Sequence, residues 1–149
     1  MDKEMQEFIL KLLERGKDLT IATIRPDGYP QATTVSYAND GMTIYIGIGK
    51  NSQKAKNIQA CSKVSLTINN DYEDWDHIQG LSIGADAEIL QNENDVRRAG
   101  ECLMKRFPQV AQWANDEHSH DFVLLRIRPK VISVLDYQKG FGHTDLVTV

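Results

Sequence analysis

Residues 19–58, LTIATIRPDGYPQATTVSYANDGMTIYIGIGKNSQKAKNI, decide the fold class of this chain. Within and just before this stretch, three segments alternate β-favouring residues: 18–24, 31–38 and 42–48. RPDG at 25–28 and NDG at 39–41 separate these segments. Both have typical turn chemistry, because proline presets φ and glycine tolerates positive φ. We therefore predict three strands that form a β-meander over residues 18–48.

The rest of the chain adds strands and a few helices. Further strands are expected at 63–69, 78–90 and 122–135, the last interrupted at Pro129. Helices are expected at 3–15, at 53–60 with Asn51 or Ser52 as cap, from Asn92 or Asn94 to about Phe107, and at 110–114. No strand-helix-strand alternation runs through the chain, so we do not expect a parallel sheet. Six antiparallel strands fit a small barrel, which closes its own edges.

Composition narrows the function classes. The chain has 149 residues, which indicates one domain over 1–149, and its net charge is −4. An acidic chain lacks the basic face of a general nucleic-acid binder. We find neither a signal peptide nor an apolar run that could span a bilayer, so we expect a cytoplasmic protein with no membrane partner. Cys61 and Cys102 suggest small core residues rather than a disulfide framework or zinc cluster.

The segment GIGKNSQKAKNI, residues 47–58, is the best candidate binding site. It runs from a strand through a glycine-rich turn into a helix, whose N-terminus attracts anions. Three lysines, Lys50, Lys54 and Lys56, crowd this opening and indicate a bound anion. An exposed helix with an ordinary cap explains the residues equally well. The spacing fits neither a Walker loop nor a dinucleotide fingerprint.

Other candidates are weaker. KGFGH, residues 139–143, would suit a flexible aromatic flap over a planar ligand, although a plain packing anchor for the terminus is slightly favoured. The acidic stretch 70–76 predicts a solvated loop, with Trp75 packed beneath it. His118 and His120 lack a third ligand at metal spacing, so no metal site is expected. No residue is assigned as catalytic.

Taken in order, IATIRPDGYPQATTV, YIGIGKNSQKAKNI with VSLTI after it, and GLSIGADAEIL resemble the pyridoxamine 5′-phosphate oxidase-like family. This FMN-binding split-barrel group includes general stress proteins and 5-nitroimidazole-resistance-type proteins. The similarity covers residues 3–137. It implies a six-stranded antiparallel split β-barrel of Greek-key topology, with an N-terminal helix and short flanking helices. It also implies a homodimer with FMN at the interface.

The resemblance also implies cofactor-binding positions. By motif and neighbourhood they are Thr33, Thr34, Val35, Tyr45, Ile46, Lys50, Asn51, Ser52, Gln53, Lys54, Gln79 and Gly80. Gln53 stands where the family's phosphate-binding motif has arginine, which removes a bidentate donor that Lys50 or Lys56 could replace. The chain ends in KGFGHTDLVTV, where the oxidase has a longer segment with Arg and Trp that hold the pyridoxal substrate. Phe141 and His143 are candidates for a cap over a substrate.

The resulting hypothesis is an FMN-dependent oxidoreductase that acts on an unidentified small molecule with an unidentified electron donor. Two alternatives stay open. One is a non-catalytic flavin-binding or stress-associated protein. The other keeps the fold and binds haem or a deazaflavin cofactor.

Overall fold

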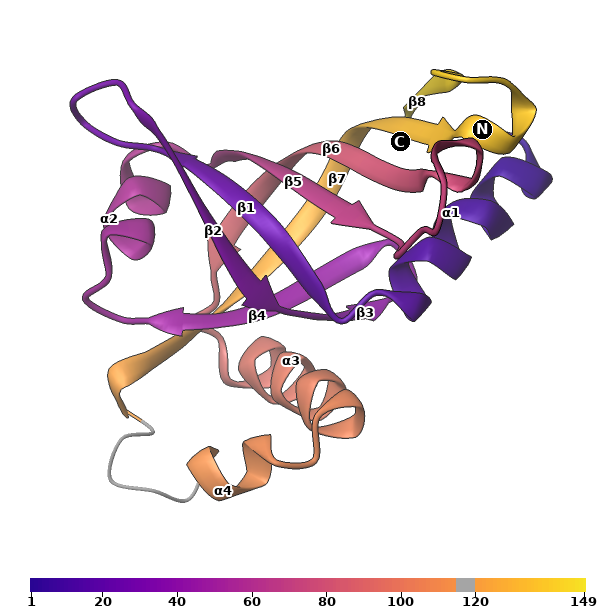
Figure 1. Cartoon of the computed structure of the whole chain (residues 1–149). Coiled ribbons are helices and arrows are strands. Elements are labelled where there is room, and N and C mark those ends of the chain that lie inside the picture. Colours follow the sequence, from indigo (N-terminus) through magenta and orange to yellow (C-terminus); the bar gives the residue numbers. More distant parts are fainter. Residues whose placement is uncertain (115–119) are drawn as a thin grey trace.

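Eight strands form one antiparallel sheet, which curls into a half-barrel (Figure 1). The structure is a computed structural model that describes residues 1–114 and 120–149; His118 lies outside them. The strands are β1 (Asp18–Ile24), β2 (Pro30–Ser36), β3 (Ala38–Asp40), β4 (Thr43–Gly49), β5 (Lys63–Asn69), β6 (Gln79–Ile89), β7 (Phe122–Asp136) and β8 (Thr144–Thr148). The strand order is β2-β1-β5-β6-β7-β4-β3, and β8 also pairs with β7. This mainly β, antiparallel architecture confirms the expected split-barrel fold class.

The curl brings distant strands together around one core. β2 and β4 lie far apart in the strand order yet contact each other, and Figure 1 shows β4 passing beneath β1 and β2. Alternate residues of each strand face inward, as in β5, where Val64, Leu66 and Ile68 are buried. This period of two follows from the pleat, which sends successive side chains to opposite faces.

The predicted meander over residues 18–48 is wrong in its last step. β1 and β2 form the expected hairpin, but β4 pairs with β7 and β3 instead of β2. Ile44, Tyr45 and Ile46 are all buried, so β4 needs cover on both of its faces. The barrel core covers Ile44 and Ile46 on one face, and a separate cluster with Ala99 and Leu103 covers Tyr45 on the other. β7 and the short β3 pair with the two edges of β4, and the expected turn before β4 is present with Gly41 at φ 59°.

Two features of the C-terminal part also differ from the prediction. β7 continues past Pro129, because the interruption becomes a bulge: Ala85 pairs with Pro129 and Gly84 with Val131. Proline cannot donate to a ladder, which suits such an irregularity. The tail, for which the sequence predicts no strand, forms β8 on the half of β7 that β4 leaves free.

The helices begin and end close to where the sequence predicts. The α-helices are α1 (Lys3–Arg15), α2 (Gln53–Ala60), α3 (Glu93–Arg106) and α4 (Val110–Ala114). Two 3-10 turns connect strands: η1 (Trp75–His77) lies between β5 and β6, and η3 (Tyr137–Lys139) lies between β7 and β8. Asp2, Ser52 and Asn92 cap the first three helices with side-chain oxygens. Within the described residues, no helix is long and apolar enough to cross a membrane.

One arginine ties α3 to the end of α1. The guanidinium of Arg106 donates to the carbonyl oxygens of Leu13, Glu14 and Gly16. It also lies 4.8 Å from the ring centroid of Tyr37, a fully buried residue whose hydroxyl donates to Leu13 at 2.6 Å. Burial raises the pKa of Tyr37 to about 12. A second, smaller apolar cluster then fills the space under α3: Ala38, Tyr45, Leu90, Ala99 and Leu103, with the half-buried Cys102 beside it.

Candidate functional site

The glycine-rich turn between β4 and α2 builds the N-terminus of α2. The hydroxyl of Ser52 donates to the carbonyl of Gly49 at 2.7 Å and accepts from the amide of Ala55 at 3.2 Å. Ser52 therefore holds the turn and caps the helix at once. Lys50 and Asn51 are exposed beside it, and the first helical turn carries no acidic residue.

Lys54 is half-buried against β2, with a hydroxyl as its partner. Its ammonium donates to Thr33 Oγ1 at 3.0 Å, and burial lowers the pKa of the Lys54 side chain. Across the described ranges, no carboxylate forms an ion pair with it. An ammonium has three N–H donors and costs free energy to desolvate, so this cation is suited to receive an anion.

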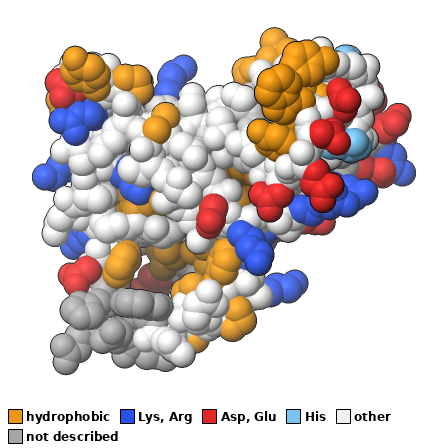
Figure 2. All heavy atoms as spheres, in the orientation of Figure 1, with side chains coloured by type: hydrophobic (Ala, Val, Ile, Leu, Met, Phe, Trp, Pro, Cys, Tyr) orange, Lys and Arg blue, Asp and Glu red, His pale blue; other side chains and the backbone are white. Residues whose placement is uncertain are grey.

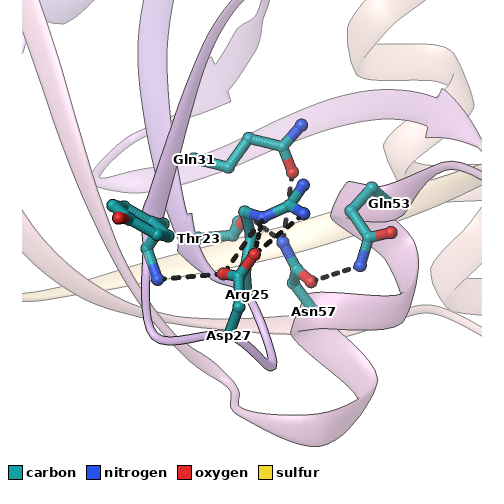
Figure 3. A network of polar contacts seen from close by, with 7 residues as sticks. Thr23, Arg25, Asp27, Gln31, Gln53 and Asn57 are labelled. Carbon is teal, nitrogen blue, oxygen red and sulfur yellow. Dashed lines mark hydrogen bonds and ion pairs between the residues drawn. The ribbon is translucent and has the colours of Figure 1, made fainter.

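A buried polar network fastens α2 to the β1–β2 hairpin (Figure 3). The Asn57 amide nitrogen donates to Thr23 Oγ1 at 3.0 Å and to Gln31 Oε1 at 3.2 Å. Its oxygen accepts from Gln53 Nε2 at 2.8 Å, and Figure 3 shows this Gln53 amide turned toward Asn57. Asn57 and Thr23 are each only 1% exposed. Gln53, expected among the cofactor-binding positions, thus supports the residue that anchors the helix.

Sequence reasoning did not single out Asn57. The available signal was its spacing of four residues from Gln53, which places both side chains on one face of the helix. That face also carries Ile58 against the core. Polar residues on a buried helix face need partners, and here the partners come from β1 and β2, which are distant in sequence.

The remaining β2 candidates fall on two faces. Thr33 and Val35 are half-buried on the side that Lys54 approaches, and Val35 packs against the core. Thr34 is exposed on the opposite side. The strand therefore offers Thr33 to the same space as Lys54, while Thr34 points away from it.

Tyr45 and Ile46 lie inside the protein. Ile46 is fully buried in the barrel core, and Tyr45 is 3% exposed in the cluster under α3. Neither side chain offers appreciable surface in a single chain. Their role at a flavin stays a prediction.

The other candidates lie at the opposite end of the sheet from α2, where Figure 1 places β8. Gln79 Nε2 donates to Asp136 Oδ1 at 3.2 Å, and Gly80 is buried so tightly that a Cβ would lie 2.6 Å from Asn69 Oδ1. His143 Nε2 lies 2.9 Å from an Asp145 oxygen. A single chain therefore does not bring Gln79 and Gly80 together with Lys54.

Phe141 and Trp75 contradict the expected packing. Phe141 is 70% exposed, and Trp75, expected beneath its loop, is 66% exposed. Their ring centroids lie 6.0 Å apart, and Phe141 also contacts Tyr137. The acidic loop is too polar to cover an indole, so Trp75 packs against the tail instead. Phe141 accordingly does not anchor the terminus in the barrel core.

The fold and the site together define a small split-barrel protein. Its lysine-bearing helix α2 packs against the β1–β2 hairpin. The family model of pyridoxamine 5′-phosphate oxidase matches residues 1–136, so this chain belongs to that family. Among its relatives, General stress protein 26 of Bacillus subtilis (strain 168) is 21% identical over 136 residues, which cover 90% of each chain.

Solved structures share the fold at low identity. A haem binding protein from Mycobacterium smegmatis superposes with a TM-score of 0.82 and 16% identity, over 99% of this chain and 59% of that one. The chain thus spans little more than half of that protein. A FAD-binding protein from Mesorhizobium loti gives a TM-score of 0.70 and 16% identity, over 90% of this chain and 94% of that one. The fold therefore occurs in neighbours described as flavin-binding and as haem-binding.

Proposed function

We propose that this chain is an FMN-binding flavoprotein whose phosphate site is formed by Lys54 and the N-terminus of α2. The observation that carries the proposal is the half-buried Lys54 ammonium, which has a hydroxyl partner and no carboxylate beside it in the part of the chain that the structure describes. A phosphate would supply the missing negative charge and accept from the free N–H groups at the start of α2. Membership of the family and a flavin-binding structural neighbour support FMN as the molecule that carries this phosphate.

The chain's own residues have distinct tasks in this proposal. Lys54 binds the phosphate, and Thr33 holds the ammonium in place from β2. Asn57 and Gln53 keep α2 fixed to the hairpin, while the exposed Lys50 adds positive charge beside the turn. FMN, when bound, supplies hydride or single-electron transfer, which makes an oxidoreductase acting on a small molecule the reaction class we propose. We assign no general acid or base.

We further propose a homodimer that completes the site. Gln79 and Gly80 lie at the end of the sheet away from Lys54, so a flavin that touches both groups must take them from two chains. Flavin binding and dimerisation would then be linked. Saturation at 100 times the dissociation constant should add about 2.7 kcal/mol of apparent stability. We place the protein in the cytoplasm as part of the same proposal.

The experiment compares FMN with riboflavin, which lacks the phosphate, on wild type and Lys54→Met. A charge-assisted contact is worth about 1.5–3 kcal/mol, so the variant should bind FMN roughly tenfold or more weakly and riboflavin as wild type does. Lys17→Met, which removes an exposed lysine elsewhere, is the matched control and should bind FMN normally. Equal FMN affinity in Lys54→Met and wild type would refute the phosphate site.

Haem is the second candidate, because a structural neighbour of high TM-score is a haem binding protein. An absorption spectrum of the purified protein separates the two, since oxidised flavin and haem have different bands. If the protein binds haem, and Lys54→Met binds haem with the same affinity, haem would replace FMN in the proposal. Turnover with a reduced nicotinamide and an acceptor separates an enzyme from a non-catalytic flavin-binding protein.

A further inference from the structure

A pocket at the β8 end of the sheet has no part in the phosphate site. It has a volume of about 390 Å³ and is lined by Asp76, His77, Tyr137, Gln138, Gly140 and Phe141. η1 and η3 contact each other here, so the pocket joins two segments that are far apart in sequence. Its volume is at the small end of the range for ligand pockets, which favours a small molecule.

Aromatic rings form its apolar wall. Tyr137 and Phe141 both line the pocket, with ring centroids 5.4 Å apart and planes at 63°. Trp75 packs against Phe141 from outside. Phe141 is 70% exposed and Trp75 66% exposed, so both side chains are accessible to a ligand from solvent. The faces of aromatic rings carry partial negative charge and attract cations.

The loop beside the pocket is acidic, so its charge is negative, like the partial charge on the ring faces. The loop before η1 and η1 itself carry four acidic residues: Asp71, Glu73, Asp74 and Asp76. His77 lies 2.5 Å from an Asp74 oxygen, so even a protonated imidazole is balanced by that carboxylate. Lys139 is 3.9 Å from Asp145 on β8. Figure 2 shows acidic side chains beside a group of hydrophobic ones at the corner where Figure 1 places β8.

From the rings and the charge together, we propose that this pocket binds a small organic cation, such as a molecule with a quaternary ammonium group. The cation lies against the faces of Tyr137 and Phe141, and the Asp76 carboxylate supplies the counter-charge. A bare metal ion fits less well, because no three potential ligands converge anywhere in the described residues. A purely apolar partner fits less well too, since it would desolvate the acidic loop. The proposal does not depend on FMN binding.

The first test measures charge selectivity by calorimetry with choline and its uncharged isostere 3,3-dimethylbutan-1-ol. The two have nearly the same shape, so a cation site should bind choline at least about threefold more tightly. Quenching or a shift of tryptophan fluorescence that is lost in Trp75→Phe would place the bound choline at this end of the sheet. Equal affinities, or no measurable binding of choline, would overturn the proposal.

Variants then separate the ring faces from apolar bulk. Phe141→Leu keeps an apolar side chain and removes the ring, so it should weaken choline roughly threefold or more and leave the isostere unchanged. Phe122→Leu, at an exposed phenylalanine on β7, is the matched control. Asp76→Asn should weaken choline and reduce the salt dependence of its binding, whereas the same change at the exposed Asp86 should not.

A second copy of this chain is the other possible occupant of this surface, and the oligomeric state of the protein tests it. Sedimentation of wild type and Phe141→Leu shows whether the rings hold a second copy of the chain. If wild type is a dimer that does not bind choline and Phe141→Leu is a monomer, the surface belongs to the dimer interface and the cation site is overturned. Unchanged oligomeric state with weakened choline binding supports it.

Discussion

Asn57→Ala should loosen the hold of α2 on the barrel. The substitution removes the two hydrogen bonds that the Asn57 amide donates to Thr23 and Gln31, and the one it accepts from Gln53. Gln31 and Gln53 are half-buried, so water can replace their lost partner. Thr23 is only 1% exposed, so its hydroxyl loses a partner where water has no access.

The magnitude follows from these environments. A buried polar group left without its partner costs about 1–3 kcal/mol, and the two half-buried bonds add about 0.5–1.5 kcal/mol each. Alanine is a better helix former than asparagine and returns roughly 0.6 kcal/mol. We expect Asn57→Ala to lower the free energy of unfolding by about 1.5–5 kcal/mol. Gln59→Ala, at an exposed position of the same helix, should change it by less than about 0.5 kcal/mol.

Urea unfolding at one fixed protein concentration measures both variants, and a double-mutant cycle tests the cause. Thr23→Val removes the hydroxyl and keeps the shape of the side chain. In the Asn57→Ala background it should be nearly neutral or stabilising, because the orphaned group is gone. If Asn57→Ala costs no more than Gln59→Ala, or if the two substitutions are additive, the network does not fasten α2 and this reasoning is wrong.

Two further predictions follow from the charged contacts. Arg106→Ala should lower the free energy of unfolding in urea by about 2–4 kcal/mol. The substitution removes a charged donor to the end of α1, including the Leu13 carbonyl, and the cation over the Tyr37 ring. A loss under about 1 kcal/mol would contradict this prediction. The hydrogen bond that the protonated His77 ring donates to the Asp74 carboxylate raises the pKa of His77. Asp74→Asn should therefore lower that pKa toward about 6.5 in an NMR titration, and an unchanged titration would contradict it. Because the folded-state pKa of His77 is raised and that of Asp74 is lowered, the pair stabilises the fold at pH values between the two pKa values. This contribution disappears as pH rises through the pKa of His77 and as pH falls through the pKa of Asp74.

Local features could be predicted well from the sequence. The cap at Ser52, the stop at Gly16 and the turn with Gly41 all occur where the sequence predicts them. Caps and turns depend on residues within three or four positions of one another, so their chemistry is visible in a short window. The order of motifs also indicated the family, which the match over residues 1–136 confirms.

Part of the candidate site was visible in the same way. The lysines around α2 stand out because cations at a helix N-terminus oppose the helix dipole unless an anion is present. Their spacing does not tell which lysine is buried. Lys54 becomes the strongest candidate only because β2 brings Thr33 to within 3.0 Å of its ammonium. Asn57 gains its role in the same way, from Thr23 on β1.

The sequence by itself thus determined the helices, most of the strands, the helix caps and the turn between β1 and β2, because each depends on neighbours along the chain. Only the tertiary structure decided that β4 pairs with β7, that Tyr45 is buried under α3, and that Phe141 meets Trp75 at an open pocket. Alternation of side chains indicates which face of a strand is apolar but not which strand lies beside it. The pairing partner of a strand depends on how all the faces of the sheet become buried together. This involves segments that are distant in sequence, so a short window of residues does not reveal it.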